Sequence, residues 1–232
     1  MTINWGNLKE TEPVSKPWQK YVAWAKAHQE ALAVSGIIII IVALFVPYYL
    51  HSRQQSEKDA AGVLDLGQYY MKAHVDPKNG PFKTTAEKYG QCLQTFQRID
   101  TDYPGTSADK IAKYYSAKCQ YLMGQYSQAY SNFDAAAEDL KGTPLADSAL
   151  MGKILSLGAQ NQWNQAESEA KLFLTEKPNS FLTPQVQLEL SDIYLQLKDP
   201  ADAKKELEIT AKASAGSSWG QEADRRLKNM KA

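Results

Sequence analysis

The pattern of the chain begins with a long apolar stretch near the N-terminus. Residues 31–50 contain no charged side chain and include five consecutive isoleucines at 37–41. A helix rises about 1.5 Å per residue, so this stretch reaches about 30 Å, the thickness of the hydrocarbon layer. A buried core helix would show a polar face, and a cleaved signal peptide would end in small residues, where this chain has His51-Ser52-Arg53. The stretch therefore predicts an uncleaved transmembrane anchor.

The residues flanking this anchor indicate its orientation. Residues 1–30 form a polar tail that ends in a predicted short amphipathic helix, which either lies along the membrane surface or simply extends the span into the cytosol. Three lysines precede the span within twenty residues (Lys16, Lys20 and Lys26), and two basic residues follow it (Arg53 and Lys58). This bias favours a cytoplasmic N-terminus and a remaining chain outside the cytoplasm.

The rest of the chain repeats with a period of 37 residues. A small residue recurs at this step, and three positions before it stands an aromatic ring or, in the last copy, a proline. These positions are Cys92, Ala129, Ala166 and Ala203, preceded by Tyr89, Tyr126, Trp163 and Pro200. Fixed positions at a period in the thirties are typical of stacked helical hairpins, in which the small residue lets two helices approach closely.

The 37-residue period divides the chain after the span, residues 51–232, into three segments. Residues 51–83 are predicted as a connecting helix and an insertion loop, with Leu64, Gly67 and Tyr70 on the inner face of the helix. Residues 84–214 hold the repeats, and residues 215–232 form a C-terminal capping helix with Trp219, Ala223 and Leu227 pointing inward. Thr106, Thr143 and Thr183 are expected to cap helices within the repeats.

One copy of the repeat carries a recognisable motif. Gly124-x-Tyr126-x-x-Ala129-x-x-x-Phe133-x-x-Ala136 resembles the second half of a tetratricopeptide repeat. The period is three residues longer than the 34 usual in that family, which leaves a generic solenoid of helical hairpins as the alternative. The predicted fold class is therefore all-α, with an N-terminal transmembrane helix followed by a tetratricopeptide-like helical-hairpin solenoid.

Composition and motifs argue against several functions. The 26 basic and 26 acidic side chains balance, so no general positive field is available to bind nucleic acid. Two cysteines and three histidines show no metal-ligand spacing, and no phosphate loop or nucleophile elbow is present in the sequence. Ser107-x-x-Lys110 has the spacing of a hydrolase dyad but is expected to be a helix start with a solvated lysine. We expect no catalytic residue, no metal and no cofactor.

Cys92 and Cys119 can form either a disulfide or a pair of small buried thiols.

A stack of helical hairpins instead offers a concave face formed by the first helix of each pair. The residues expected on that face are apolar and aromatic with a few charges: Ile111, Tyr114, Lys118, Tyr121, Met151, Leu155, Leu188, Asp192 and Leu195. They predict a groove for an extended or helical protein segment. The alternative is that several of them belong to the core, because an error of one residue in the helical register changes which side chains are assigned to the concave face.

The architecture also resembles a known bacterial family. The sequence from Ala23 to Val34, followed by a span, a polar helix and three or four repeats, is similar to the single-span tetratricopeptide proteins that act as ancillary subunits of the Sec translocon. The resemblance implies an inner-membrane protein with its N-terminus in the cytoplasm, its repeats in the periplasm, and protein partners among translocon and chaperone components.

Two functions follow as hypotheses. The first is a membrane-anchored interaction module that serves protein translocation or periplasmic chaperoning. The second is a structural or assembly subunit of a larger membrane or envelope complex, which would use the span and the aromatic tail as contacts. A third hypothesis, an enzyme, is supported by no residue of the sequence.

Overall fold

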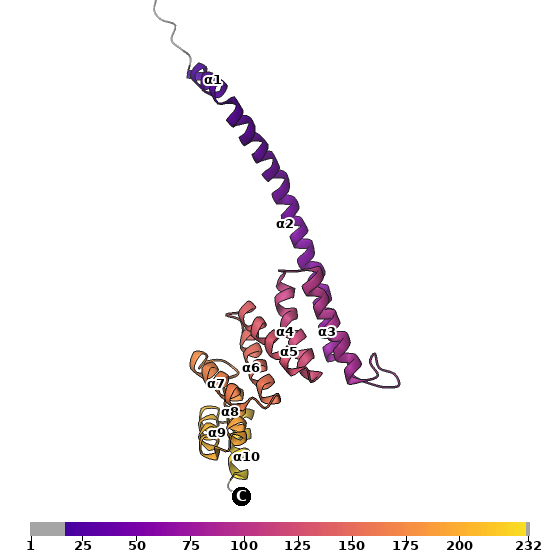
Figure 1. Ribbon diagram of the computed structural model, residues 1–232, viewed down its shortest axis with the longest axis vertical. Helices are drawn as coiled ribbons and strands as arrows, with labels where there is room; N and C mark the ends of the chain where they lie inside the picture. Colours follow the sequence, from indigo (N-terminus) through magenta and orange to yellow (C-terminus); the bar gives the residue numbers. More distant parts are fainter. Residues whose placement is uncertain (1–16, 231–232) are drawn as a thin grey trace, which may run out of the picture. The chain divides into compact units, whose positions relative to one another are not determined.

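The computed structural model describes residues 17–230, and these residues are helical with short connections (Figure 1). The chain divides into two compact units, residues 1–54 and 55–232. The helices within the described range are α1 (Pro17–Ala27), α2 (Gln29–Lys72), α3 (Thr85–Asp102), α4 (Ser107–Leu122), α5 (Tyr126–Asp139), α6 (Pro144–Ala159), α7 (Trp163–Glu176), α8 (Thr183–Gln196), α9 (Pro200–Ala213) and α10 (Ser218–Asn229). The prediction of an all-helical fold is confirmed for this part of the chain.

The apolar stretch of the sequence lies in α2, a helix of 44 residues. Its most apolar window is long enough to cross a membrane, and none of that window is buried within the protein. A core helix would be covered by other helices, so the exposure of these side chains argues against that interpretation. A break at His28 separates α1 from α2, which places the end of the tail helix three residues before the predicted position, Glu30. The His28 ring stacks on Trp24, with 4.9 Å between the ring centroids.

The second half of α2 belongs to the second compact unit, residues 55–232, which we call the soluble unit. Ala60, Leu64 and Gly67 are buried there, and they pack with Phe96 of α3. Gly67 is required by this contact, because a Cβ at that position would lie 2.6 Å from Cζ of the Phe96 ring. The segment between α2 and α3 is a loop in which Val75 and Phe82 form an isolated bridge. Residues 55–72 of α2 thus contribute to the core of the second unit.

Three helix ends in the soluble unit share the same turn at a step of 37 residues. Gly124, Asn161 and Lys198 each adopt positive φ, with values of 78°, 57° and 62°. In each turn the following amide donates to the carbonyl five residues back: Gln125 to Gln120 at 2.9 Å, Gln162 to Leu157 at 3.0 Å, and Asp199 to Tyr194 at 2.8 Å. This pair of features is the Schellman motif, which ends a helix and reverses the chain. The turns therefore begin α5, α7 and α9 at Tyr126, Trp163 and Pro200 in identical register.

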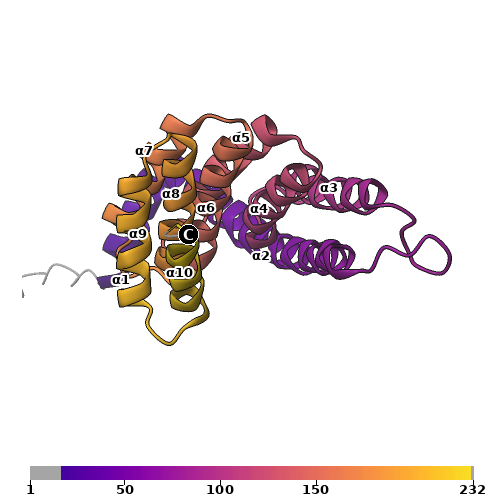
Figure 2. The same ribbon diagram turned by 90° about the horizontal axis from the view of Figure 1, so that it is seen from below.

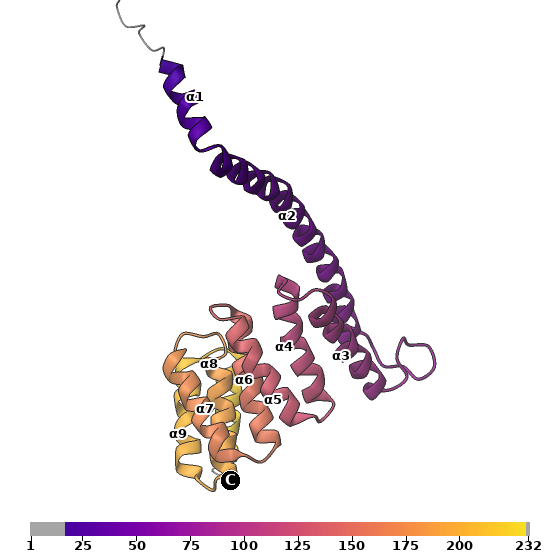
Figure 3. The same cartoon turned by 45° about the horizontal axis from the view of Figure 1, so that its top comes forward.

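The core follows the same period. The small residues Cys92, Ala129, Ala166 and Ala203 are all completely buried. Each lies near the start or middle of the second helix of a pair, where it allows the neighbouring helix to come close. Successive helices from α3 to α9 pack against one another in chain order, as Figures 1 and 3 show. The soluble unit is thus a stack of helices with its core distributed along the stack rather than gathered in one centre.

The last helix, α10, closes the end of this stack. It packs against both α9 and α8, and Figure 2 shows it beside them. Its Ala223 is buried with Leu188 and Leu207, and Leu227 is partly buried beside them. The prediction for Trp219 is wrong: this side chain is 38% exposed, and its neighbour Gly220 is buried instead. Ala223 and Leu227 lie inward as predicted, but Gly220 has no side chain to reveal its burial, so the hydrophobic pattern assigned the first inward position to Trp219.

The predicted helix caps are correct at two of three positions. Thr106 and Thr143 cap α4 and α6, accepting hydrogen bonds from the amides of Asp109 and Ala146. Thr183 does not cap α8, because it is the first residue of the helix and its hydroxyl donates to the carbonyl oxygen of Lys177 at 3.0 Å. Its hydroxyl ties the preceding loop to the helix instead.

Candidate partner-binding groove

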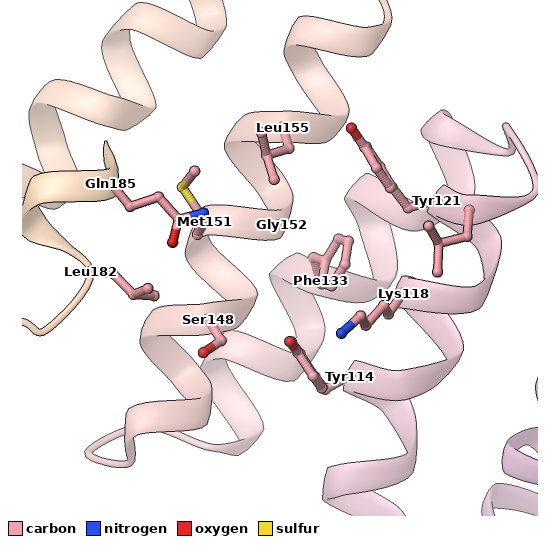
Figure 4. Close-up of a pocket in the computed structure, with 11 residues that line it drawn as sticks. Tyr114, Lys118, Tyr121, Phe133, Ser148, Met151, Gly152, Leu155, Leu182 and Gln185 are labelled. Atoms are coloured by element: carbon pink, nitrogen blue, oxygen red, sulfur yellow. The ribbon is translucent and has the colours of Figure 1, made fainter. Parts of the chain in front are cut away.

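Five of the nine residues expected on the concave face line one cavity. Tyr114, Lys118 and Tyr121 from α4 face Met151 and Leu155 from α6, as Figure 4 shows. The cavity measures about 290 Å³, and the start of α8 closes its far side. A cavity of about 150 Å³ holds a benzene ring, so this one accommodates about two ring-sized side chains. We call this cavity the α4–α6–α8 groove. Its full lining is Tyr114, Lys118, Tyr121, Leu122, Phe133, Ser148, Met151, Gly152, Leu155, Leu182 and Gln185.

The groove exists because α6 approaches α5 through a glycine. A Cβ at Gly152 would lie 2.6 Å from Cε1 of the Phe133 ring, so only glycine lets the ring sit against the helix backbone. Phe133 is buried and contributes to the floor between α4 and α6. The spacing of α4 and α6, each the first helix of its pair, therefore depends on Phe133 of α5, a second helix.

Both tyrosines of the groove are supported by neighbouring rings. Tyr114 lies 5.2 Å from Tyr115 and 5.8 Å from Phe133 between ring centroids, and Tyr121 lies 5.3 Å from Tyr126. Burial raises the pKa of both phenols, so each remains protonated at neutral pH. Neither hydroxyl makes a hydrogen bond within residues 17–230, which leaves both available to a ligand. Rings held in place in this way lose little conformational entropy when a partner binds.

Polar contacts also fix the helices that carry the groove. Lys153 of α6 contacts Asp134 of α5 and Glu169 of α7, both at 2.8 Å. Burial opposes the charge of Lys153, but the two carboxylates outweigh it and raise its pKa. Ser180, in the loop before α8, donates to Asp147 of α6 at 2.6 Å. These bonds join α5, α6, α7 and the loop before α8.

The other four expected residues lie elsewhere. Ile111 is partly buried between two core clusters and does not line the groove. Leu188 is only 4% exposed, because α10 covers it, and Asp192 pairs with Arg226 of α10 at 2.7 Å. Leu195 is 42% exposed near the end of α8, apart from the lining. The expectation of one continuous concave face is therefore corrected at α8, where the capping helix occupies that surface.

Six lining residues were not predicted from the sequence. They are Leu122, Phe133, Ser148, Gly152, Leu182 and Gln185. Ser148 and Leu122 continue the faces of α6 and α4, and a search for the helical period that included polar residues could have found them. Phe133 comes from a second helix and Leu182 from a loop, and neither has a sequence signal that connects it with this face.

Charged side chains are distributed unequally along the groove. Among the described residues that line it, Lys118 carries the one charge, and it makes no ion pair within residues 17–230. A carboxylate lies near the other end: Glu189, one turn after Gln185 in α8, contributes to raising the pKa of Tyr121. Burial raises the pKa of Glu189 itself, Asp192 adds to this effect, and Arg226 opposes it. Glu189 makes no hydrogen bond or ion pair with the described residues.

We expect Glu189→Gln to stabilise the protein at neutral pH. The folded pKa of Glu189 is raised above its ordinary value of 4.5, so the folded state favours the protonated form. Ionisation at neutral pH therefore costs stability, and this cost disappears as the pH falls through the folded pKa toward 4.5. Chemical denaturation of both proteins at neutral pH and near pH 4 measures the difference. A variant that is less stable than the wild type at neutral pH would contradict this assignment.

The two cysteines and Ser107 have structural surroundings in the soluble unit. Cys92 and Cys119 are free thiols in the core of the first hairpins, and Cys119 contacts the sulfur of Met71 at 3.4 Å. Thr106 rather than Ser107 caps α4, and the backbone amide of Ser107 donates to the Glu57 carboxylate at 3.0 Å. Among the described residues, no group of three or more His, Cys, Asp or Glu side chains is arranged to hold a metal ion.

Comparisons with known proteins complete the description of the site. No family model matches the chain, and no curated protein or solved structure matches it either.

Proposed function

We propose that this protein is a membrane-anchored protein–protein interaction module. In this proposal the apolar part of α2 spans the inner membrane of a bacterium with the N-terminus in the cytoplasm. The helices that follow form a tetratricopeptide-like scaffold in the periplasm. The scaffold holds polypeptides near the site of protein translocation, or presents them to chaperones. Anchoring keeps the groove at a high effective concentration at the membrane, so weak binding is sufficient.

The observation that carries the proposal is the α4–α6–α8 groove. It is lined by two tyrosines with free hydroxyls and by leucines such as Leu122, which is 41% exposed, while the buried Met151 and Phe133 form its floor. Exposed apolar surface of this kind usually marks a binding site, because it otherwise favours aggregation. The 37-residue step of the turns and of the buried small residues supports a tetratricopeptide-like scaffold around this groove.

The membrane orientation is tested by thiol labelling. Asn79 is exposed in the loop between α2 and α3, and both native cysteines are buried, so Asn79→Cys introduces a single accessible thiol in the soluble unit. We expect a reagent that does not cross the inner membrane to label this variant in intact spheroplasts. An Asn7→Cys variant should react only after the membrane is made permeable. The reverse pattern would contradict the proposed topology.

A second candidate function is a fixed subunit of a larger membrane complex. Leu66 and Tyr69 of α2 are 44% and 60% exposed in the soluble unit, and this exposed face can pack against a permanent partner. Purification from native membranes separates the two functions. A constant stoichiometry that is lost in a Leu66→Ser, Tyr69→Ser variant favours the subunit. A mixture of substoichiometric polypeptides that does not respond to these changes favours the interaction module.

A further inference from the structure

The charges around the groove are arranged to orient what binds there. Lys118 extends into the cavity beside Tyr114, as Figure 4 shows, and the lining contains no carboxylate to neutralise it. An unpaired ammonium beside apolar side chains is a site for a carboxylate, because a nearby opposite charge compensates the loss of water that binding causes. This end of the groove is therefore complementary to an acidic group.

The opposite end has the opposite charge. Glu189 lies close to the C-terminal part of α6, since a Cβ at Gly158 would be 3.9 Å from its Oε1 atom. Burial raises the pKa of Tyr121, and the charge of Glu189 adds to this effect. Tyr121 lines the groove about one helical turn after Lys118. The other charged groups near Glu189 are Asp192 and Arg226, and these two bind each other at 2.7 Å, so they largely cancel. Glu189 follows the lining residue Gln185 by four positions in α8, so it lies on the same side of that helix, just beyond the lining, and it has no ion-pair partner among the described residues.

We propose that the α4–α6–α8 groove binds an apolar polypeptide segment with a carboxylate on one side and a cationic group on the other, the carboxylate lying at Lys118 and the cation toward Glu189. The inference rests on the proposed function and adds the chemistry and the direction of the bound segment. Apolar side chains fill the cavity and provide the affinity. The two charges select the orientation, because the reversed segment places like charges together.

Four labelled peptides of about fourteen residues test this proposal on the full-length protein in nanodiscs. They share one apolar core of Leu, Phe and Val. The flanks are Glu on one side and Lys on the other, Glu on both sides, Lys on both sides, or Gln on both sides. Binding is measured by fluorescence anisotropy, and empty nanodiscs correct for binding to lipid. We expect the peptide with both charges to bind about fivefold more tightly than the Gln peptide, with an advantage that shrinks as salt is added.

Variants of the two charged residues make the test specific. Lys118→Gln should remove the advantage of the doubly charged peptide, and Lys118→Glu should shift the preference to the peptide with Lys on both sides. Glu189→Gln should bring the affinity of the peptide with Glu on both sides up to that of the doubly charged peptide. Circular dichroism confirms that each variant is folded, and Lys110→Gln, at an exposed position of the same helix, serves as the control.

The outcomes separate this inference from the proposed function. Equal binding of all four peptides, or a charge preference that survives Lys118→Gln, would overturn the orienting role while leaving an apolar groove that binds polypeptides. Failure of every peptide to bind the folded wild-type protein would overturn both.

Discussion

Replacing Ala129 by leucine should destabilise the soluble unit by about 1 to 3 kcal/mol. Ala129 is completely buried, with Phe133, Ala117 and Ala149 in the same cluster, so three additional carbon atoms have no space to occupy. The helices must separate or the new side chain must leave its preferred rotamer. The full-length protein in detergent should therefore unfold at a lower temperature or denaturant concentration, as followed by circular dichroism.

The same helix provides the control. Ser131 is exposed two residues later in α5, and Ser131→Leu should change the free energy of unfolding by no more than about 0.5 kcal/mol. Ala166→Leu, one period further along, should resemble Ala129→Leu, because Ala166 is also completely buried. Equal and small effects at Ala129 and Ser131 would show that the 37-residue register does not describe the packing.

Removing both tyrosine rings from the groove, by Tyr114→Ala with Tyr121→Ala, should weaken partner capture more than tenfold. A tenfold loss corresponds to about 1.4 kcal/mol, and a single aromatic anchor at an interface often contributes more than this. Both rings are held by aromatic neighbours and line the cavity from the same helix, so the loss of both removes one wall of the groove. Binding of the doubly charged peptide by the full-length protein is the measurement.

Stability must be measured on the same samples. Tyr114 also packs on Phe133, so the double variant can lose some stability, and Tyr89→Ala provides a comparison because Tyr89 packs against the core cluster of α2 and α3, outside the lining. A folded double variant that binds the peptide as strongly as the wild type would exclude the groove as the contact surface. An equal loss of binding in Tyr89→Ala would indicate a general structural effect.

Much of the fold could be predicted from the sequence because it depends on local patterns. The apolar run in α2 and the 37-residue step of small residues are properties of neighbouring positions, and both coincide with helices in the structure. The errors arose where a side chain responds to distant groups. Thr183 precedes proline as Thr143 does, yet only Thr183 meets the carbonyl of Lys177 and gives up its capping role. Gly220 is buried without an apolar side chain to indicate it.

The groove was only half predictable for a similar reason. Helical spacing correctly grouped Tyr114, Lys118, Tyr121, Met151 and Leu155, because residues three or four positions apart share a face of one helix. That rule says nothing of which surfaces other helices cover. The pairing of Arg226 with Asp192 places α10 over the expected face of α8, and this contact joins residues 34 positions apart. The charge pattern of the groove likewise depends on contacts between helices, because Lys118 of α4 and Glu189 of α8 are 71 positions apart in the sequence.

Photo-crosslinking in native membranes tests most directly whether the groove is where polypeptides bind. Leu122 lines the groove and is 41% exposed, whereas Leu172 of α7 is 51% exposed and lies outside the lining, so the two sites form a matched pair. A photoreactive amino acid at position 122 should crosslink to other polypeptides, and Tyr114→Ala with Tyr121→Ala should suppress these products. The same amino acid at position 172 should give few products, and those should not respond to the tyrosine changes. Crosslinks of equal yield from both positions, unaffected by the loss of the tyrosines, would contradict the assignment of the groove as the binding site.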